Sequence, residues 1–236
     1  MFTMSTLYVV ATPIGNLEDV TLRAIRILKE VDLILCEDTR ETRKLLSAYD
    51  IRTPVESYHA QSTRGKAEKI LKMLGEGKNL ALVSDAGTPT ISDPGSLLVE
   101  QIYERFGNPP QGEVRVVPIP GANAALAALS VSGIPSSSFL FFGFLPHKKG
   151  RETLFKEIAV SKRTVVFYES PHRIEKTLVS LAQYLKDTPD RKISIGRELT
   201  KKFEEIISGS VEDVATYFLS NSERIKGEFV VIVSGA

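Results

Sequence analysis

The chain of 236 residues is poor in the residues and segments that build disulfides, metal centres and membrane anchors. Its single cysteine, Cys36, cannot form an internal disulfide, and its apolar surroundings predict a buried strand thiol, as suits a reducing compartment. The three histidines lie far apart and no HExxH or CxxC spacing occurs, so we expect no metal site. No run approaches the roughly 20 apolar residues that span a bilayer, and residues 1–5 lack the features of a signal peptide. These absences predict a cytoplasmic protein without a membrane anchor.

Motifs for phosphate binding and for covalent catalysis are missing too. The chain has neither the GxxxxGK loop that cradles nucleotide phosphates nor the GxGxxG turn that binds a pyrophosphate, so we expect no polyphosphate ligand. It also lacks a GxSxG elbow, and its serines and threonines are typical of helix caps and turns. Nothing therefore points to a covalent nucleophile.

Charge is nearly balanced overall but unevenly distributed. Residues 1–119 carry 14 basic and 16 acidic side chains, whereas residues 120–236 carry 16 and 13. Basic clusters lie at residues 147–151, 162–163 and 201–202. Such clusters are usually solvated surface, but in turns they also permit an RNA-binding face. Charge alone does not choose between these interpretations.

Apolar runs that resemble strands end in loops of mostly small residues at three places. The runs are residues 7–10, 80–83 and 114–119, and the loops are residues 11–16, 84–89 and 120–123. Carboxyl ends of parallel strands share one edge of a sheet, where open α/β proteins bind ligands, and small side chains let a ligand contact the backbone. None of the loops contains Lys or Arg. We therefore expect them to line one pocket for a compact ligand that is not strongly anionic.

Strand and helix patterns alternate along the chain, which predicts α/β structure. In the first half the expected strands are 7–10, 33–36, 55–58, 80–83 and 114–119, and the expected helices are 21–29, 39–48, 64–75 and one opened by Asp93 and Pro94. In the second half the expected strands are 139–144, 164–168, 193–196, 203–207 and 229–233, and the expected helices are 122–131, 152–159, 171–184 and 211–219. Residues 197–202 are too few for a helix, so the strands around them predict an antiparallel hairpin. We expect two α/β domains, residues 1–119 with a parallel sheet and residues 120–236 with a mixed sheet.

Charged residues follow two of the expected strands. Asp85 could orient a ligand through its hydroxyl or amino groups, or it could bond its own backbone as aspartates in turns do. Asp38 and Glu41 have the spacing of a capping box. Arg40 and Arg43 are not explained in this way, because cations near the amino end of a helix oppose its dipole. They are candidate contacts for a substrate phosphate.

A second helix start has the same unfavourable charge. Ser170 and Pro171 are typical of a first helical turn, whereas His172 and Arg173 place positive charge there. A bound phosphate would explain the arrangement, and so would a nearby carboxylate such as Glu169.

Six segments, taken in order, resemble a known family. They are residues 7–19, 36–40, 84–89, 118–124, 167–173 and 197–201. These segments are similar to those of the ribosomal RNA small subunit methyltransferase I family, the RNA-modifying branch of the tetrapyrrole methylase superfamily. Relatives that modify tetrapyrroles carry GxGPGD and GGDP loops, which this chain replaces with residues 11–16 and 84–89. The difference argues against a porphyrin or corrin substrate.

The resemblance implies a tetrapyrrole methylase-like fold with S-adenosylmethionine in the cleft between the two domains. It implies methylation of the ribose 2′-hydroxyl of a cytidine in the decoding region of small-subunit (16S) ribosomal RNA. The enzyme would be a homodimer, and its partner would be this RNA or the assembled small ribosomal subunit. The cofactor-binding residues that the resemblance implies are Pro13, Ile14, Val83, Asp85, Ala86, Gly87, Thr88, Asn123, Ala124, Glu169, Leu199 and Thr200.

The expected reaction would benefit from a general base, because a ribose hydroxyl is a weak acid. Positions at strand ends make Glu37, Asp38 and Glu169 the candidates. The candidate contacts to substrate RNA are Arg40, Arg43, His172, Arg173, Lys148 and Lys149. Two other functions stay open at this point: methylation of a tetrapyrrole or another small molecule, and RNA binding during ribosome assembly without catalysis.

Overall fold

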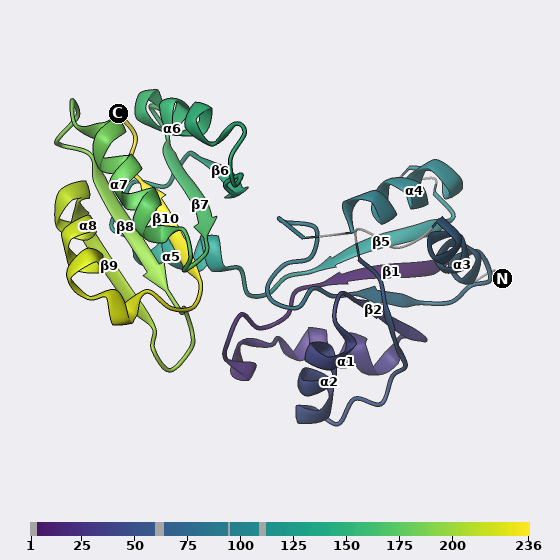
Figure 1. Cartoon of the computed structure of the whole chain (residues 1–236). Coiled ribbons are helices and arrows are strands. Elements are labelled where there is room, and N and C mark those ends of the chain that lie inside the picture. Colours follow the sequence, from purple (N-terminus) through teal and green to yellow (C-terminus); the bar gives the residue numbers. More distant parts are fainter. Residues whose placement is uncertain (1–3, 60–63, 94, 109–111) are drawn as a thin grey trace. The chain divides into compact units, whose positions relative to one another are not determined.

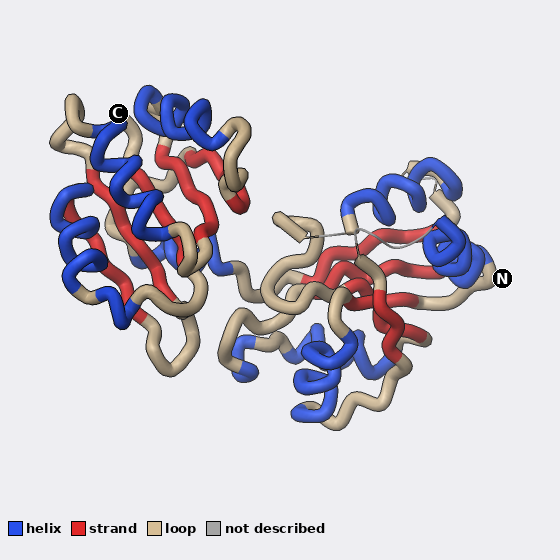
Figure 2. The backbone as a smooth tube through the Cα atoms, viewed as in Figure 1, coloured by secondary structure: helices blue, strands red, loops and turns tan. Residues whose placement is uncertain are grey.

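The computed structural model describes residues 4–59, 64–93, 95–108 and 112–236 (Figure 1). The chain divides into two compact units, Met1–Asn123 and Ala124–Ala236, and each is built around one five-stranded sheet (Figure 2). The predicted fold class of two α/β domains is confirmed.

The first unit is a parallel sheet with the strand order β3-β2-β4-β1-β5. Its strands are β1 Ser5–Val10, β2 Leu33–Cys36, β3 Val55–Ser57, β4 Leu80–Leu82 and β5 Val114–Ile119. Its helices are α1 Leu22–Glu30, α2 Thr39–Ala48, α3 Arg64–Gly75 and α4 Ser96–Phe106, with a short 3-10 helix, η1 Leu17–Asp19. Because all five strands run the same way, their carboxyl ends share one edge of the sheet.

Side chains that alternate along these strands build two cores, one on each face of the sheet. Leu35 and Leu82 pack with residues of α3 and α4, whereas Cys36 and Ala81 pack with residues of α1. Figure 1 shows α1 and α2 on one side of the sheet and α3 and α4 on the other. The Cys36 thiol is buried as predicted, and this burial raises its pKa.

The second unit is a mixed sheet with the strand order β6-β7-β10-β8-β9. Its strands are β6 Phe139–Phe144, β7 Thr164–Glu169, β8 Lys192–Arg197, β9 Glu205–Ser210 and β10 Phe229–Val233. Its helices are α5 Ala124–Val131, α6 Arg151–Val160, α7 Ile174–Leu185, α8 Val211–Ser220 and the 3-10 helix η2 Ser222–Arg224. Only β6 and β7 are parallel neighbours, and β8 and β9 form the predicted antiparallel hairpin.

The core of the second unit lies between its sheet and three helices. Phe167, Ile195 and Val231 are inaccessible to solvent and pack with residues of α6, α7 and α8. The remaining helix, α5, contacts β7 and β10. Among the described residues of both units, no helix combines the length and the apolar character that a membrane crossing requires.

Helix α4 begins later than the sequence predicted. Its N-cap is Gly95 rather than Asp93, and Pro94 lies outside the described residues. Gly95 has a φ angle of 126°, and a Cβ there would lie only 2.7 Å from the Leu82 side chain. Only glycine fits this position without strain, so the cap is set by packing against the sheet.

Helix α7 also begins later, at Ile174 instead of Pro171. The Ser170 carbonyl accepts hydrogen bonds from the backbone N–H groups of both Arg173 and Ile174, which closes a turn before the helix. The Ser170 hydroxyl accepts a hydrogen bond from Arg173 Nε at 3.2 Å and is not the helix cap.

Candidate functional site

The loops that follow β1, β4 and β5 contact one another in the first unit. Thr12 and Gly87 form an isolated antiparallel bridge, with N–H to carbonyl distances of 2.9 and 3.0 Å. The Thr88 hydroxyl donates to the Ala122 carbonyl at 3.2 Å, and the Asn123 amide donates to the Thr88 hydroxyl at 3.4 Å. The structure therefore brings together three loops that lie far apart in the sequence.

The small residues of these loops allow the loops to pack closely against one another. The sequence predicted only that small residues would let a ligand contact the backbone. A Cβ on Gly121 would lie 2.9 Å from the Ala11 Cβ, and one on Gly87 would lie 3.4 Å from Ile14 Cγ2. Gly87 also has a φ angle of 83°, which favours glycine. The other predicted cofactor residues in or beside these loops are Pro13, Val83, Ala86 and Ala124.

The substitution Gly121→Ala is expected to lower the free energy of unfolding by about 1–3 kcal/mol, because the added methyl group overlaps Ala11 and separates two loops. Gly75→Ala is the matched control in the same unit, since its added Cβ would lie 3.4 Å from the Phe106 ring, an ordinary contact distance. Urea unfolding followed by circular dichroism measures both variants. Equal stability of the two would show that the loops tolerate separation.

Asp85 joins the loop after β4 to the end of β2. Its Oδ1 accepts a hydrogen bond from the backbone N–H of Asp38 at 3.0 Å. The sequence left open a bond to the residue's own turn, but this contact reaches another strand end instead. Asp85 is nevertheless an exposed residue, so a ligand can reach its carboxylate.

Glu37 is a half-buried carboxylate at the end of β2. Its pKa is raised to about 7, mainly by burial and to a smaller extent by the negative charges of Asp93 and Asp85. Burial also raises the pKa of Asp93, which a hydrogen bond with Ser84 partly offsets. Carboxyl groups whose pKa values are raised in this way are typical of functional sites that bind a cation or accept a proton.

Asp93 is a member of this acidic cluster that the sequence interpretation missed. Its spacing to the following helix suggested a cap, and only the tertiary fold places it beside Glu37. Among the described residues, no group of His, Cys, Asp and Glu side chains is arranged to hold a metal ion.

Asp38 differs from Glu37 because it is fully engaged as the cap of α2. Its carboxylate accepts a hydrogen bond from the Arg40 backbone N–H at 2.8 Å and pairs with the Arg40 guanidinium at 2.6 Å. The hydrogen bonds from Arg40 hold the Asp38 pKa at about 2. Glu41 pairs with Lys44 at 2.7 Å, so the predicted capping box is correct for Asp38 but not for Glu41.

Glu169 lies at the end of β7 in the second unit and is completely buried. Its Oε2 accepts hydrogen bonds from Arg151 and Thr177, both at 2.7 Å. Its Oε1 forms an ion pair with Arg173 and accepts a hydrogen bond from the backbone N–H of Ser170, both at 2.8 Å. Both carboxylate oxygens therefore have two partners each.

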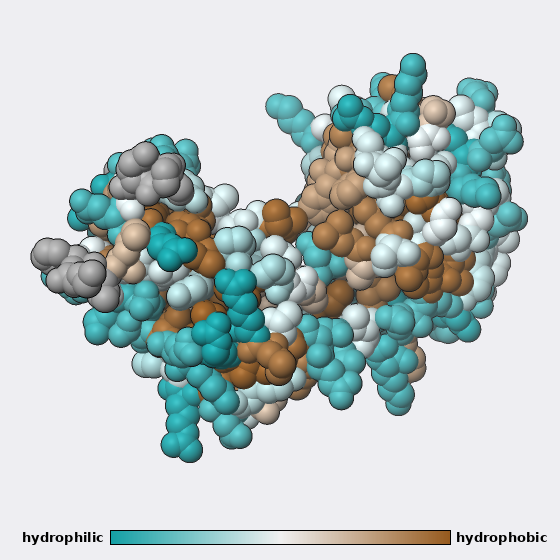
Figure 3. Space-filling model, turned by 180° about the vertical axis from the view of Figure 1, so that it is seen from behind, coloured by the Kyte–Doolittle hydropathy of each residue, from teal (hydrophilic) through white to brown (hydrophobic). Residues whose placement is uncertain are grey.

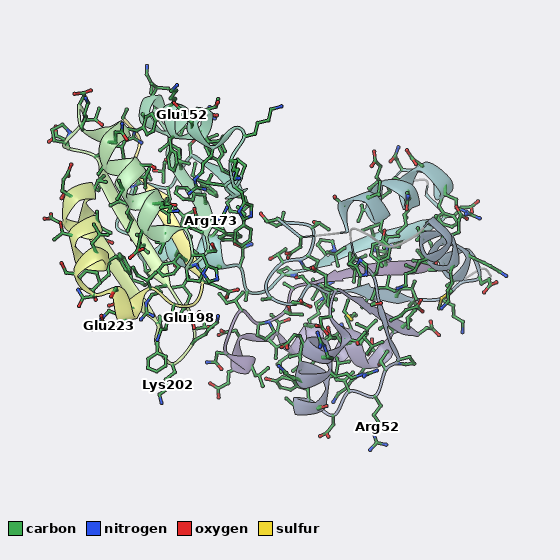
Figure 4. The ribbon with its side chains drawn as sticks, in the orientation of Figure 1. Arg52, Glu152, Arg173, Glu198, Lys202 and Glu223 are labelled. Carbon is green, nitrogen blue, oxygen red and sulfur yellow. The ribbon has the colours of Figure 1, made fainter. Side chains whose placement is uncertain are left out.

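This network changes two of the predicted roles. Because Glu169 is enclosed and doubly ion-paired, we withdraw it as a candidate general base. Arg173, labelled in Figure 4, also donates to the Leu145 carbonyl at 2.8 Å, so a neighbouring carboxylate explains its position and we withdraw it as an RNA contact. The predicted RNA contacts at exposed positions are Arg40, Arg43, Lys148, Lys149 and His172.

The loop between β8 and β9 carries the last two predicted cofactor residues. Leu199 is buried and packs against Gly196, where an added Cβ would lie 3.2 Å from Leu199 Cδ2. Thr200 has a φ angle of 65°, and Thr90, in the loop after β4, has one of 73°. A left-handed conformation is rare for β-branched residues and concentrates in functional loops.

Comparison with known proteins gives a family for this fold and site. A model of the Tetrapyrrole (Corrin/Porphyrin) Methylases matches residues 6–215. A relative from Halalkalibacterium halodurans named ribosomal RNA small subunit methyltransferase I is 50% identical over 232 residues, covering 98% of this chain and 76% of the relative. The chain belongs to the ribosomal RNA small subunit methyltransferase I family. A relative of the same name from Thermotoga maritima is 43% identical, with 98% of this chain and 99% of the relative covered.

Solved structures support the fold of this family member. Diphthine synthase superposes with a TM-score of 0.71 at 13% identity, covering 98% of this chain and 90% of that structure. Uroporphyrin-III C-methyl transferase from Thermus thermophilus, complexed with S-adenyl homocysteine, gives a TM-score of 0.62 at 18% identity, with 97% of each chain covered. At these identities the likeness establishes the fold alone. Membership of the methyltransferase I family makes this chain a methyltransferase and confirms the resemblance of the six sequence segments.

Proposed function

We propose that this protein transfers the methyl group of S-adenosylmethionine to the ribose 2′-hydroxyl of a cytidine in the decoding region of small-subunit (16S) ribosomal RNA. The observation that carries the proposal is its 50% identity, over 98% of the chain, to a ribosomal RNA small subunit methyltransferase I. The acidic strand-end loops of the first unit support it chemically.

The residues of the first unit fit this cofactor, which when bound supplies a methyl group on a positively charged sulfur. The clustered carboxylates of Glu37, Asp85 and Asp93 repel one another, and a cationic ligand relieves that repulsion. The three loops contain no Lys or Arg that would oppose such a ligand. We propose that Asp85 accepts hydrogen bonds from the ligand's hydroxyl or amino groups.

Glu37 is the carboxylate that we propose as the general base. A base is most effective when its pKa lies near the working pH, and the pKa of Glu37 is about 7. Asp38, whose pKa is about 2, is a much weaker base. Glu169 is excluded from solvent by its ion pairs. The raised pKa of Glu37, the low pKa of Asp38 and the ion pairs of Glu169 support Glu37 as the proposed base.

The proposed partner is the small-subunit ribosomal RNA or the assembled small subunit. Arg40, Arg43, His172, Lys148 and Lys149 occupy exposed positions, and we propose that they contact RNA phosphates. The proposal includes action in the cytoplasm as a homodimer. Light scattering tests the dimer, for which the expected mass is twice the 26.0 kDa of one chain.

Transfer of label to ribosomal RNA tests the activity. The protein is incubated with methyl-labelled S-adenosylmethionine and with small subunits that lack the modification. We expect label in the 16S RNA, and primer extension at limiting nucleotide concentration should stop at one cytidine of the decoding region. Label in a tetrapyrrole but not in RNA would overturn the proposal, and so would RNA binding without any transfer.

A further inference from the structure

A cavity of about 530 Å³ lies in the second unit, between the β8–β9 loop and η2. Its lining includes Lys202, Phe203, Arg224 and Lys226, and Figure 4 labels Lys202 with two carboxylates of the same lining, Glu198 and Glu223. Cavities of about 300–1,000 Å³ are typical of sites for small ligands. None of the roles proposed above uses this cavity.

Phe203 distinguishes this cavity from ordinary surface. Its side chain is 64% exposed, and the Lys202 ammonium lies 5.6 Å from the ring centroid, within cation–π distance. Exposed hydrophobic residues are common in proteins and are visible on the face shown in Figure 3, so exposure alone is not evidence of a ligand. An exposed aromatic ring beside a cation, on the wall of a cavity, is the feature that needs an explanation.

A network around Glu205 holds another part of the cavity wall in place. Arg197 donates to Glu205 at 3.1 Å, and Arg224 and Tyr217 also donate hydrogen bonds to this carboxylate. The Arg224 guanidinium lies 5.6 Å from the centroid of the Tyr217 ring. The wall is therefore built from groups that already satisfy one another.

Lys202 and Lys226 give the cavity available positive charge. Within the part of the chain that the structure describes, neither ammonium group forms an ion pair with a carboxylate. Glu198 and Glu204 also line the cavity, but both accept hydrogen bonds within their own loop. An anionic group can therefore approach the two lysines although carboxylates are nearby.

We propose that this cavity binds one unpaired nucleotide of the substrate RNA, with its base stacked on Phe203 and its phosphate beside Lys202 and Lys226. Proteins that bind single-stranded RNA combine aromatic stacking platforms with cations in this way. The inference rests on the proposed function, because it takes the substrate to be RNA.

Fluorescence tests the stacking directly, because the chain contains no tryptophan. Phe203→Trp introduces a single reporter, and a short single-stranded oligoribonucleotide is expected to quench its emission, whereas duplex RNA of the same sequence is not. Leu219→Trp is the matched control, since Leu219 is 50% exposed on α8. Equal quenching of both variants, or of neither, overturns the inference. Emission that depends on protein concentration without RNA would place a second copy of the chain there and would overturn it too.

Kinetics provides the second test. Phe203→Ala is expected to raise the KM for small subunits by about 5- to 150-fold, the loss typical of one base–aromatic stack, with unchanged affinity for S-adenosylmethionine. Phe203→Tyr keeps an aromatic ring and should retain the wild-type KM. If the wild-type protein transfers no label, the proposed function fails. If it transfers label and Phe203→Ala leaves KM unchanged, only the present inference fails.

Discussion

Replacing Glu37 with glutamine is expected to lower kcat for methyl transfer by about 10²- to 10⁴-fold while leaving the affinity for S-adenosylmethionine nearly unchanged. Glutamine has almost the same shape, but its amide cannot accept the proton of the ribose hydroxyl. Single-turnover transfer of label to small subunits measures the rate, and calorimetric titration measures the affinity. Loss of both together would assign Glu37 to cofactor binding or to structure rather than to proton transfer.

The pH dependence of kcat/KM also tests whether Glu37 is the base. Because the base acts when deprotonated and the pKa of Glu37 is about 7, kcat/KM should rise with pH and level off above that value. Glu37→Gln should remove this rise from the residual activity. Asp38→Asn is the matched control, because asparagine also caps helices and the Asp38 pKa of about 2 lies far from the working range. An unchanged profile in Glu37→Gln would contradict the assignment.

The stability of Glu37→Gln shows whether a loss of activity in this variant comes from the missing base or from a destabilised fold. The folded-state pKa of Glu37, about 7, exceeds its ordinary value of 4.5, so the folded protein binds this proton more tightly than the unfolded chain. The resulting stabilisation is complete below pH 4.5 and is lost as the pH rises through 7. Glu37→Gln should therefore resemble the wild type near pH 4 and be more stable than it at pH 8. Lower stability at pH 8 would attribute any loss of activity to the fold.

Hydrophobic periodicity was sufficient to predict the sheets and most of the helices. The bounds of β2 and β10 were predicted correctly because buried apolar runs end where polar residues begin. Helix α2 was also predicted correctly, since its cap, Asp38, is local in the sequence. The starts of α4 and α7 were not predicted correctly. The start of α4 is fixed by the packing of Gly95 against Leu82, and the start of α7 is fixed by the turn at Ser170. Local signals therefore predict elements better than they predict where elements begin.

The candidate site was predictable only in outline. Parallel strands bring their carboxyl ends to one edge, so the meeting of the loops after β1, β4 and β5 followed from the sequence. The pKa of Glu37 depends on its burial and on Asp93, and neither can be read from spacing. The cavity beside Phe203 is formed by the β8–β9 loop and η2, and the six family segments include neither Phe203 nor η2. The pKa of Glu37 and the cavity therefore both depend on tertiary contacts, which a sequence pattern does not show.

Replacing Glu169 with glutamine is expected to lower the free energy of unfolding of the second unit by about 3–5 kcal/mol. The substitution leaves the Arg151 and Arg173 guanidinium groups, which are 15% and 16% exposed, without the carboxylate that forms an ion pair with each of them. Burial of an unpaired charge costs far more than loss of a surface pair. Urea unfolding at neutral pH measures the effect.

Glu152→Gln is the matched control in the same unit, and Figure 4 labels both Glu152 and Arg173. Glu152 pairs with Lys156 at 3.2 Å, but the two side chains are 71% and 65% exposed, so the loss of this pair should hardly change the stability. A small effect of both substitutions would show that the Glu169 network contributes little to stability. If Glu169→Gln abolished methyl transfer while the protein kept its stability, Glu169 would be restored as a candidate base, because its enclosure by Arg151, Arg173 and Thr177 would then have to open during the reaction.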